Sequence, residues 1–288
     1  MSAEESPVVA AFNADSSRRE AVHFGLLASR VLGAPFVAVT VHRAGPMVGA
    51  VGGDIDDDPH AGGGRAVEHV RTELKRRGVR KPDVRVIDAR RAGAGLAEAI
   101  RDIAPRLVVL GTPRHRGAGG KMLGDTVEAV IHESTIPVAL VPPGHHAEEG
   151  MLKVIGAAFA PTEEGRVALS TAAALARAAD ARLRAIEVRD DVSDGASPEL
   201  EEALSQLGVD AVAEPVDGDP AEGLVAATST VDLLVTGSRA RGPRRALMLG
   251  SVSRAVAERA ACPVLVVPRA AAEAAGELLA HAAPEPAN

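Results

Sequence analysis

One short stretch of the chain gathers residue types that could bind an anion. The segment GSRARGPRRALMLGS, residues 237–251, contains three glycines, two serines and four arginines, although the whole chain carries a formal net charge of −7. Glycine lets a phosphate approach the backbone closely, and arginine and serine supply positive charge and hydrogen-bond donors. The segment therefore predicts a phosphate-binding loop, with a solvated connection between a strand and a helix as the alternative.

The two ends of this segment place it between a strand and a helix. An apolar run ends at Gly237, and a helical pattern of apolar residues begins after Gly250 with Val252. The first amides of a helix lack intrahelical partners and carry partial positive charge, so they attract an anion. The hydroxyls of Ser251 and Ser253 could add donors, while Ser251 could equally cap the helix. The loop lacks the Gly-Lys-Ser or Gly-Lys-Thr of a P-loop.

The chain also contains an internal repeat. Matching the AAF triplets of its two halves pairs Phe12 with Phe159, and matching LVVLG with LLVTG pairs Gly111 with Gly237. The two offsets, 147 and 126 residues, differ by 21, which is the length of a Gly- and Asp-rich stretch at 44–64. A repeat of this kind predicts two similar domains, the first of which carries an inserted loop.

Each half alternates short apolar strands with helices. In the second half, the pattern predicts strands at 154–159, 181–188, 209–216, 231–237 and 262–268, and helices at 163–179, 197–208, 219–229 and 251–260. Such alternation implies right-handed crossovers and a doubly wound, mostly parallel α/β sheet of five strands in each half. Ligands of these sheets bind beyond the carboxyl ends of the strands, where the winding reverses. The predicted loop 238–249 is a candidate for that place.

Length and composition agree with two soluble domains. We assign residues 1–142 and 151–268 to the domains, 143–150 to a linker and 269–288 to a C-terminal tail. The 39 acidic against 32 basic residues, with four Phe and no Trp or Tyr, argue against a nucleic-acid partner. No apolar run reaches the length of a membrane span and the first residues lack a signal peptide, so we predict a cytoplasmic protein without a membrane partner.

The second half resembles a universal stress protein domain. The nucleotide signature of that family is a glycine, two residues, a second glycine, nine residues, and then Gly-Ser or Gly-Thr. Gly237 takes the first place here, Ala240 the second, and Gly250 with Ser251 the last pair. GDPAEGL at 218–224 and CPVLVVP at the last strand agree as well. The resemblance implies a Rossmann-like fold of the adenine nucleotide alpha hydrolase-like type, with ATP across the strand ends.

The same resemblance implies a set of cofactor-binding residues in the second half. They surround the phosphates, except for Val188 near the base: Gly237, Ser238, Arg239, Gly250, Ser251, Val252, Ser253 and Val188. It implies no catalytic residue and no protein ligand for a metal. Mg²⁺ stays open as an ion that accompanies ATP.

Two departures from the family pattern affect this site. Ala240 replaces the second glycine, and its methyl group could block a close approach or a positive φ angle. The family usually places an aspartate at the end of the first strand, where Phe159 and Ala160 stand in this chain.

The first half departs further from the pattern. Gly111 and Gly124 remain, but Arg114 takes the place of the second glycine and Asp125 that of the serine. A carboxylate at the start of a helix caps its amides and repels a phosphate that would bind there. Phe12 stands near the position of the first-strand aspartate. We therefore expect weak or no nucleotide binding in this half, which would act as a scaffold.

The remaining groups that could bind metals or act as nucleophiles have simpler structural explanations. His145 and His146 lie in the linker, where solvated side chains are favoured over a zinc site. Cys262 precedes an apolar strand and is predicted to be a buried structural thiol. The aspartates within 54–58 lack the glycine and distal glutamate of an EF-hand, so an irregular loop is favoured over a cation site.

Three hypotheses about function follow. The first is a tandem universal stress protein, a non-enzymatic stress-response protein that binds ATP mainly in its second half and presents the loop to an unknown protein partner. The second is a ligand-free interaction or regulatory module in which both sites have drifted. The third, and least favoured, is an ATP hydrolase that uses Asp219 or Asp232 near the strand ends.

The final strands of the two halves are predicted to pair inside the chain. They are IPVALVP at 136–142 and CPVLVVP at 262–268. Such pairing would make an intramolecular pseudo-dimer and hide both strand edges from aggregation. A homodimer of the whole chain stays open.

Overall fold

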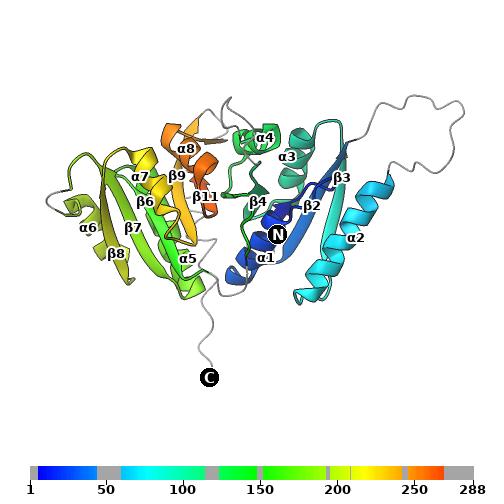
Figure 1. Ribbon diagram of the computed structural model, residues 1–288, viewed down its shortest axis with the longest axis horizontal. Helices are drawn as coiled ribbons and strands as arrows, with labels where there is room; N and C mark the ends of the chain where they lie inside the picture. Colours follow the sequence, from blue (N-terminus) through cyan, green and yellow to red (C-terminus); the bar gives the residue numbers. More distant parts are fainter. Residues whose placement is uncertain are drawn as a thin grey trace, which may run out of the picture.

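The computed structural model describes residues 6–43, 60–113, 123–147, 152–192, 195–207, 209–241 and 246–268 of the chain (Figure 1). Strands and helices alternate in both halves, as predicted. The first half contains β1 (Val8–Ala11), α1 (Glu20–Val31), β2 (Phe36–Arg43), α2 (His60–Arg76), β3 (Asp83–Ala89), α3 (Ala92–Ile103), β4 (Leu107–Gly111), α4 (Asp125–Glu133) and β5 (Val138–Val141). The aspartates within 54–58 lie outside the described residues.

The second half repeats this order. Its elements are β6 (Val154–Phe159), α5 (Glu163–Ala179), β7 (Arg182–Arg189), α6 (Pro198–Leu207), β8 (Ala211–Asp217), α7 (Pro220–Ala227), β9 (Leu233–Arg241), β10 (Ala246–Met248), α8 (Ser251–Arg259) and β11 (Val264–Pro268). The short strand β10, which pairs antiparallel with β9, was not predicted from the sequence.

The strands confirm the predicted doubly wound, mostly parallel fold. The first half has the order β3-β2-β1-β4-β5 and the second half the order β8-β7-β6-β9-β11, with parallel pairing throughout each series. The winding reverses between β1 and β4 in the first half and between β6 and β9 in the second. These two places are where a ligand of each half would bind.

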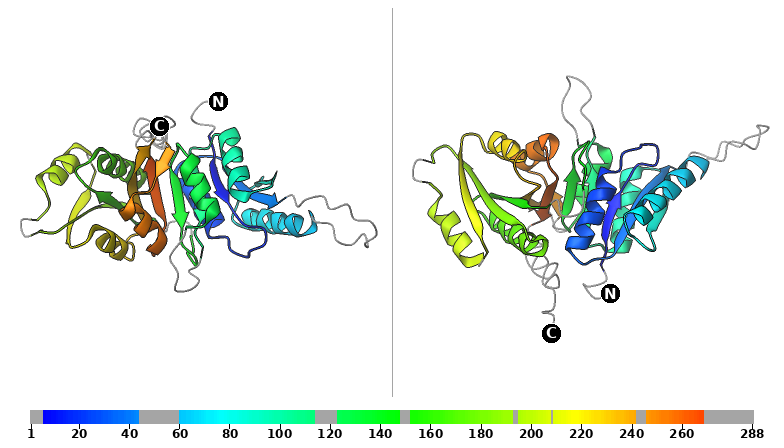
Figure 2. Two further views of the ribbon diagram at one scale, coloured as in Figure 1. Left: turned by 90° about the horizontal axis from the view of Figure 1, so that it is seen from above. Right: turned by 60° about the horizontal axis from the view of Figure 1, so that its bottom comes forward.

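The two halves join through their final strands, as predicted. β5 and β11 pair antiparallel, with Leu140 opposite Val264 and Val138 opposite Val266. The two series of strands thereby form one continuous sheet, which runs from one end of the molecule to the other (Figure 2). An ion pair on one face strengthens the junction, since Nη1 of Arg254 on α8 lies 2.5 Å from Oε1 of Glu128 on α4.

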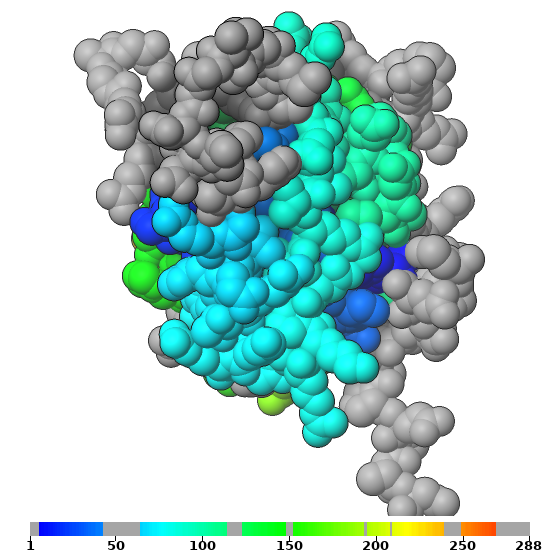
Figure 3. Space-filling model, turned by 90° about the vertical axis from the view of Figure 1, so that its right-hand side faces the viewer, coloured from blue at the N-terminus to red at the C-terminus, as the bar shows by residue number. Residues whose placement is uncertain are grey.

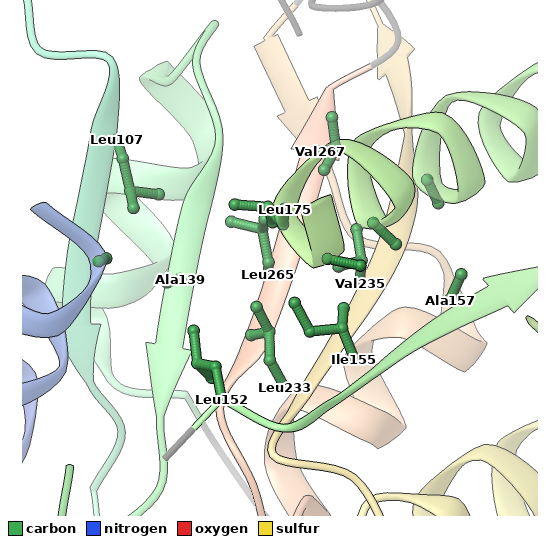
Figure 4. Packing of buried hydrophobic residues seen from close by; sticks show 14 of the residues in the cluster. Leu107, Ala139, Leu152, Ile155, Ala157, Leu175, Leu233, Val235, Leu265 and Val267 are labelled. Carbon is green, nitrogen blue, oxygen red and sulfur yellow. The ribbon is translucent and has the colours of Figure 1, made fainter. Parts of the chain in front are cut away.

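Helices cover both faces of the sheet. Buried aliphatic side chains of α1 and α5 form one cluster with β1, β4, β5, β6 and β11, and α3, α4, α7 and α8 form another on the opposite face. Figure 4 shows Ala139 of β5 facing the same core as Leu265 and Val267 of β11, so the first cluster crosses the junction. The core is almost entirely aliphatic because the chain has only four Phe and neither Tyr nor Trp.

The two ends of the sheet are edge strands. α2 packs over β3 at the first-half end, which faces the viewer in Figure 3. Val86 of β3 and Val212 of β8 are 46% and 58% exposed, and they are the large exposed hydrophobic side chains of the described residues.

Candidate functional site

The predicted phosphate loop of the second half is partly a β-hairpin. β9 continues past Gly237 and includes Ser238, Arg239 and Ala240, and its last residues pair with β10. Pairing satisfies backbone groups that a phosphate-binding loop would offer to a ligand. The prediction of a loop over residues 238–249 is therefore wrong for the residues that belong to β9 and β10. Ala240 lies in extended backbone, without the positive φ angle that a glycine would have allowed.

The first turn of α8 brings several of the predicted site residues together. Gly250 precedes the helix, and Ser253 is buried with its hydroxyl donating to the carbonyl oxygen of Gly237 at 3.2 Å. The same hydroxyl lies 3.2 Å from that of Thr236. Ser251 is exposed, and a Cβ built on Gly250 would meet no atom within 4 Å. The start of α8 is thus open on one side, while Ser253 holds the helix against β9.

Val188 and Val252 have packing roles. Val188 lies near the end of β7 and packs against the core cluster on the face of α7 and α8. A Cβ built on Gly223 of α7 would lie 2.8 Å from the Val188 side chain, which shows how closely the helix covers it. Val252, the second residue of α8, packs against the core on the same face.

The first turn of α5 covers the point where the winding reverses in the second half. A Cβ built on Gly237 would lie 2.3 Å from the carbonyl oxygen of Glu164, and one built on Gly165 would lie 2.2 Å from that of Ala160. Both distances are shorter than any real contact of a Cβ atom. The helix therefore packs directly on the ends of β6 and β9, where the family resemblance implied an ATP site.

The corresponding place in the first half is open. A cavity of about 580 Å³ lies beyond the ends of β1, β2 and β4, between the first turns of α3 and α4. A neighbouring cavity of about 380 Å³ extends from it along the connection between β1 and α1. Both are lined by Ala11, Phe12, Asn13, Gly111, Thr126 and Val127, so we treat them as the β2-side and α4-side compartments of one cleft.

The α4-side compartment of the cleft is open because α1 begins one turn later than α5. Val8 pairs with Phe36 and Ile155 with Leu183, so 28 residues separate the paired positions in both halves. Matching Phe12 with Phe159 places residues 16–19, which are not helical, opposite the first turn of α5. Consequently, a Cβ built on Gly111 would meet no atom closer than 4.0 Å.

Local sequence explains the two helix starts. In the second half, the hydroxyl of Thr162 accepts the amide of Gly165 at 3.2 Å, and Glu163 and Glu164 follow in the first turn. This is a favourable cap with favourable charges. The first half has two arginines, Arg18 and Arg19, in front of its helix, where the helix dipole disfavours cations. There the amide of Asp15 instead bonds the Asn13 side chain at 2.9 Å.

Arginine side chains line the α4-side compartment. Nη2 of Arg18 donates to the carbonyl oxygen of Thr112 at 2.6 Å, and its Nε lies 3.4 Å from Oε1 of Glu20. The guanidinium of Arg19 lies 5.2 Å from the centre of the Phe12 ring, and its Nε is buried without a hydrogen-bond partner among the described residues. Sequence reasoning missed both arginines, although the charged Ser-Ser-Arg-Arg run before the helix was a usable signal.

Burial and ion pairs shift the pKa values of the groups beside this compartment. Burial lowers the pKa of Arg19, and the carboxylates of Glu73 and Glu20 partly oppose that effect. Burial alone would raise the pKa of Glu20, but hydrogen bonds from the Gly144 amide and from Arg18 outweigh it and lower the pKa. The Gly144 amide donates to Oε1 of Glu20 at 2.8 Å.

A carboxylate stands at the other side of the compartment. Asp125 is the exposed first residue of α4, where the second half has Ser251. Gly124 before it has φ 88° and ψ 146°, a conformation that essentially only glycine adopts. The side chain of Asp125 offers negative charge where the amides of α4 would otherwise attract an anion.

One of the two linker histidines, His145, is less solvated than predicted. The ring of His145 makes an edge contact with Phe24 of α1, with 6.0 Å between ring centres, and burial lowers the pKa of His145. His146 is exposed, and the following Ala147 is buried. The solvated linker was therefore a wrong prediction for His145, since this segment packs on α1.

The other candidate groups have structural roles. Cys262 is buried, which raises the pKa of its thiol to about 12 and confirms the predicted structural thiol. Asp219 caps α7 by accepting the amides of Ala221 and Glu222 at 2.9 and 3.0 Å. Asp232 accepts the amides of Lys153 and Val154 at 2.8 Å each. No cluster of three potential metal ligands occurs within the described ranges.

The fold and the cleft define a class: a duplicated, doubly wound α/β protein with a ligand-sized cleft where the winding of one half reverses. The chain belongs to the Universal stress protein family, whose model matches it twice, at residues 6–142 and 151–268. In the part of the chain that the structure describes, no helix is both long and apolar enough to span a bilayer.

Solved structures of similar fold include two that extend over both halves. A universal stress protein from Archaeoglobus fulgidus DSM 4304 has 20% identity and a TM-score of 0.64, covering 92% of this chain and 97% of its own. A putative universal stress protein from Pseudomonas aeruginosa UCBPP-PA14 has 14% identity and a TM-score of 0.66, covering 96% and 99%. No curated protein is significantly similar to the chain.

Proposed function

We propose that the protein is a non-catalytic, adenine-nucleotide-binding stress protein whose ligand occupies the cleft of the first half. The observation that carries this proposal is the cavity of about 580 Å³ at the point where the winding between β1 and β4 reverses. Its volume lies within the range of about 300–1,000 Å³ that is usual for small-molecule sites. Aliphatic walls from Val39, Val41 and Leu96 suit an apolar, planar base.

The ATP site predicted in the second half is a second candidate. It is supported by the open side of Gly250 and the exposed Ser251 at the start of α8, which suit a phosphate. Against it stands the first turn of α5, which occupies the strand ends beside Gly237. A ligand held there would have to reach the start of α8 past the first turn of α5.

Matched variants in the two halves separate these sites. Thr126 and Val252 are the second residues of α4 and α8, and both are half-buried. Thr126→Tyr places a large ring at the cleft of the first half, and Val252→Tyr places the same ring at the corresponding position of the second half. We expect Thr126→Tyr to weaken ATP and AMP binding at least roughly tenfold in isothermal titration calorimetry. The added ring would keep the ligand from the apolar wall of the cleft, and the lost burial should cost more than about 1.4 kcal/mol of binding free energy.

The same titration distinguishes the alternatives. Val252→Tyr should bind ATP and AMP with the same affinity as the parent protein. Loss of binding in Val252→Tyr alone would move the ligand to the second half. Absence of binding by the parent, with no shift in its melting temperature, would contradict nucleotide binding and favour the ligand-free interaction module.

The domain division and the cellular place also belong to this proposal. We assign residues 1–142 and 151–268 to the two domains, 143–150 to the linker and 269–288 to a tail, in a cytoplasmic protein that signals to an unidentified protein partner. The absence of catalysis is supported by the structural roles of Asp219 and Asp232, whose carboxylates accept backbone amides. The parent protein should therefore release phosphate from ATP no faster than the Thr126→Tyr variant.

A further inference from the structure

We propose that Arg18 binds the phosphate nearest the ribose of a nucleoside phosphate in the cleft. The inference rests on the proposed function and deepens it, since it assigns the anion to the connection between β1 and α1. The start of α4, which corresponds to the phosphate-binding position of the family signature, is then not the anion site of this half.

The guanidinium of Arg18 is held in place at the floor of the α4-side compartment. Its Nη2 donates to the carbonyl oxygen of Thr112 at 2.6 Å, and it lies 4.0 Å from a Cβ built on Gly111 at the end of β4. The side chain is 31% exposed. A guanidinium has five N–H donors in a planar fork that matches a phosphate, and the bonds to Thr112 and Glu20 use two of them.

The second half cannot place a side chain at this position. Gly165 corresponds to Arg18 when Phe12 is matched with Phe159. A Cβ built on Gly165 would lie 2.2 Å from the carbonyl oxygen of Ala160. The arginine is therefore available only because α1 begins late, so the open cleft and its cation have the same structural cause.

The opposite wall disfavours the anion. Asp125 occupies the first position of α4, where its negative charge repels a phosphate that the amides of the helix would otherwise attract. Arg19 adds positive charge on the same side as Arg18, and its buried Nε has no hydrogen-bond partner among the described residues. Two guanidinium groups stand against the one carboxylate of Glu20 on this side, and the carboxylate of Asp125 stands on the other, so the net charge favours a phosphate at the connection between β1 and α1.

A comparison of ligands with and without phosphate tests this assignment. Adenosine and AMP are titrated into the full chain by isothermal titration calorimetry. The parent should bind AMP roughly tenfold or more tightly than adenosine, which is the expected size for charge-assisted hydrogen bonds to a phosphate. Arg18→Gln should remove this preference and leave adenosine binding unchanged, and Arg18→Lys should keep part of it.

Arg166→Gln is the matched control. Arg166 is an exposed arginine in the first turn of α5, next to the position that corresponds to Arg18. It should keep the AMP preference of the parent. Equal affinity of the parent for both ligands, an intact preference in Arg18→Gln, or an equal loss of both ligands in Arg18→Gln and Arg18→Lys would overturn the assignment. Failure of the parent to bind either ligand would instead contradict the proposed function.

Discussion

The two halves of this chain have the same strand order and the same spacing of 28 residues between paired positions of their first two strands, yet the first turn of their first helix differs. The difference lies in one helical turn. Residues 163–166 begin α5 and contact the ends of β6 and β9, whereas residues 16–19 are not helical and line the α4-side compartment with Ser16, Arg18 and Arg19. A doubly wound fold therefore fixes where a ligand site can form, while the start of a single helix decides whether space remains there.

The comparison also separates a retained signature from a usable site. The second half keeps Gly237, Gly250 and Ser251, but the strand that contains Gly237 continues into a hairpin with β10. The first half has lost the signature serine to Asp125 and keeps the space. Glycines at corresponding positions of the two halves consequently have different structural surroundings. Substituting them by alanine therefore tests the comparison.

The largest effect is expected at the strand ends. Gly237→Ala would bring a methyl group 2.3 Å from the carbonyl oxygen of Glu164, a clash between backbone and side chain that should lower the free energy of unfolding by about 3 kcal/mol. Gly111→Ala, at the corresponding position, meets no atom closer than 4.0 Å and should change the free energy of unfolding by less than about 0.5 kcal/mol. Urea denaturation measures both. Equal losses would show that the two strand ends are packed alike.

The next largest effect is expected at the glycine before the last helix of each half, where alanine should destabilise the first half but not the second. Gly124 has φ 88° and ψ 146°, so Gly124→Ala should lower the free energy of unfolding by about 2 kcal/mol. Gly250 has φ −68° and open space around it, so Gly250→Ala should be neutral or slightly stabilising. Thermal and urea denaturation of the pair check this. A larger loss in Gly250→Ala than in Gly124→Ala would contradict the backbone difference.

A smaller effect is expected at the junction. Glu128 and Arg254 join α4 to α8, but their side chains are 23% and 40% exposed. A double-mutant cycle with Glu128→Gln and Arg254→Gln should therefore give a coupling energy of about 0.5 kcal/mol, which decreases with added salt. A coupling energy above about 2 kcal/mol would show that this ion pair, rather than β5 and β11, holds the halves together.

The smallest effect concerns acid. The pKa of Glu20 in the folded protein lies below its ordinary value of 4.5, so its contribution to stability is complete above that value and is lost as the pH falls through the folded pKa. Glu20→Gln should weaken the loss of stability below pH 4.5. The corresponding Val167 in the second half is buried and cannot titrate. Urea denaturation of the parent and of Glu20→Gln at a series of pH values measures this effect, and the same loss of stability in both proteins would contradict it.

Much of the fold could be predicted from the sequence. Repeated apolar strands and intervening helices gave the doubly wound halves, and α5 begins and ends where the sequence predicted. The pairing of the final strands followed from their apolar composition and their place in the repeat. The family resemblance rested on the same local patterns, which survive because each depends on residues close together in the chain.

The position of the cleft could not be predicted in the same way. Whether α5 covers Gly237 depends on a contact between two segments about 70 residues apart. The spacing of glycines carries no information about that contact. A cap at Thr162 followed by two glutamates, against Ser17 followed by two arginines, was the available signal, because the first set starts a helix early and the second delays it.

The most direct test of the account is to identify which half contacts an adenine ligand. Photolabelling with 8-azido-AMP, followed by peptide mapping, should attach the label to residues 39–42, Ala92 or Leu96, which line the β2-side compartment. Thr126→Tyr should suppress that label, and Val252→Tyr should not. Label on residues 182–189 or 251–259 of the parent, unaffected by Thr126→Tyr, would contradict the claim that the first half holds the ligand.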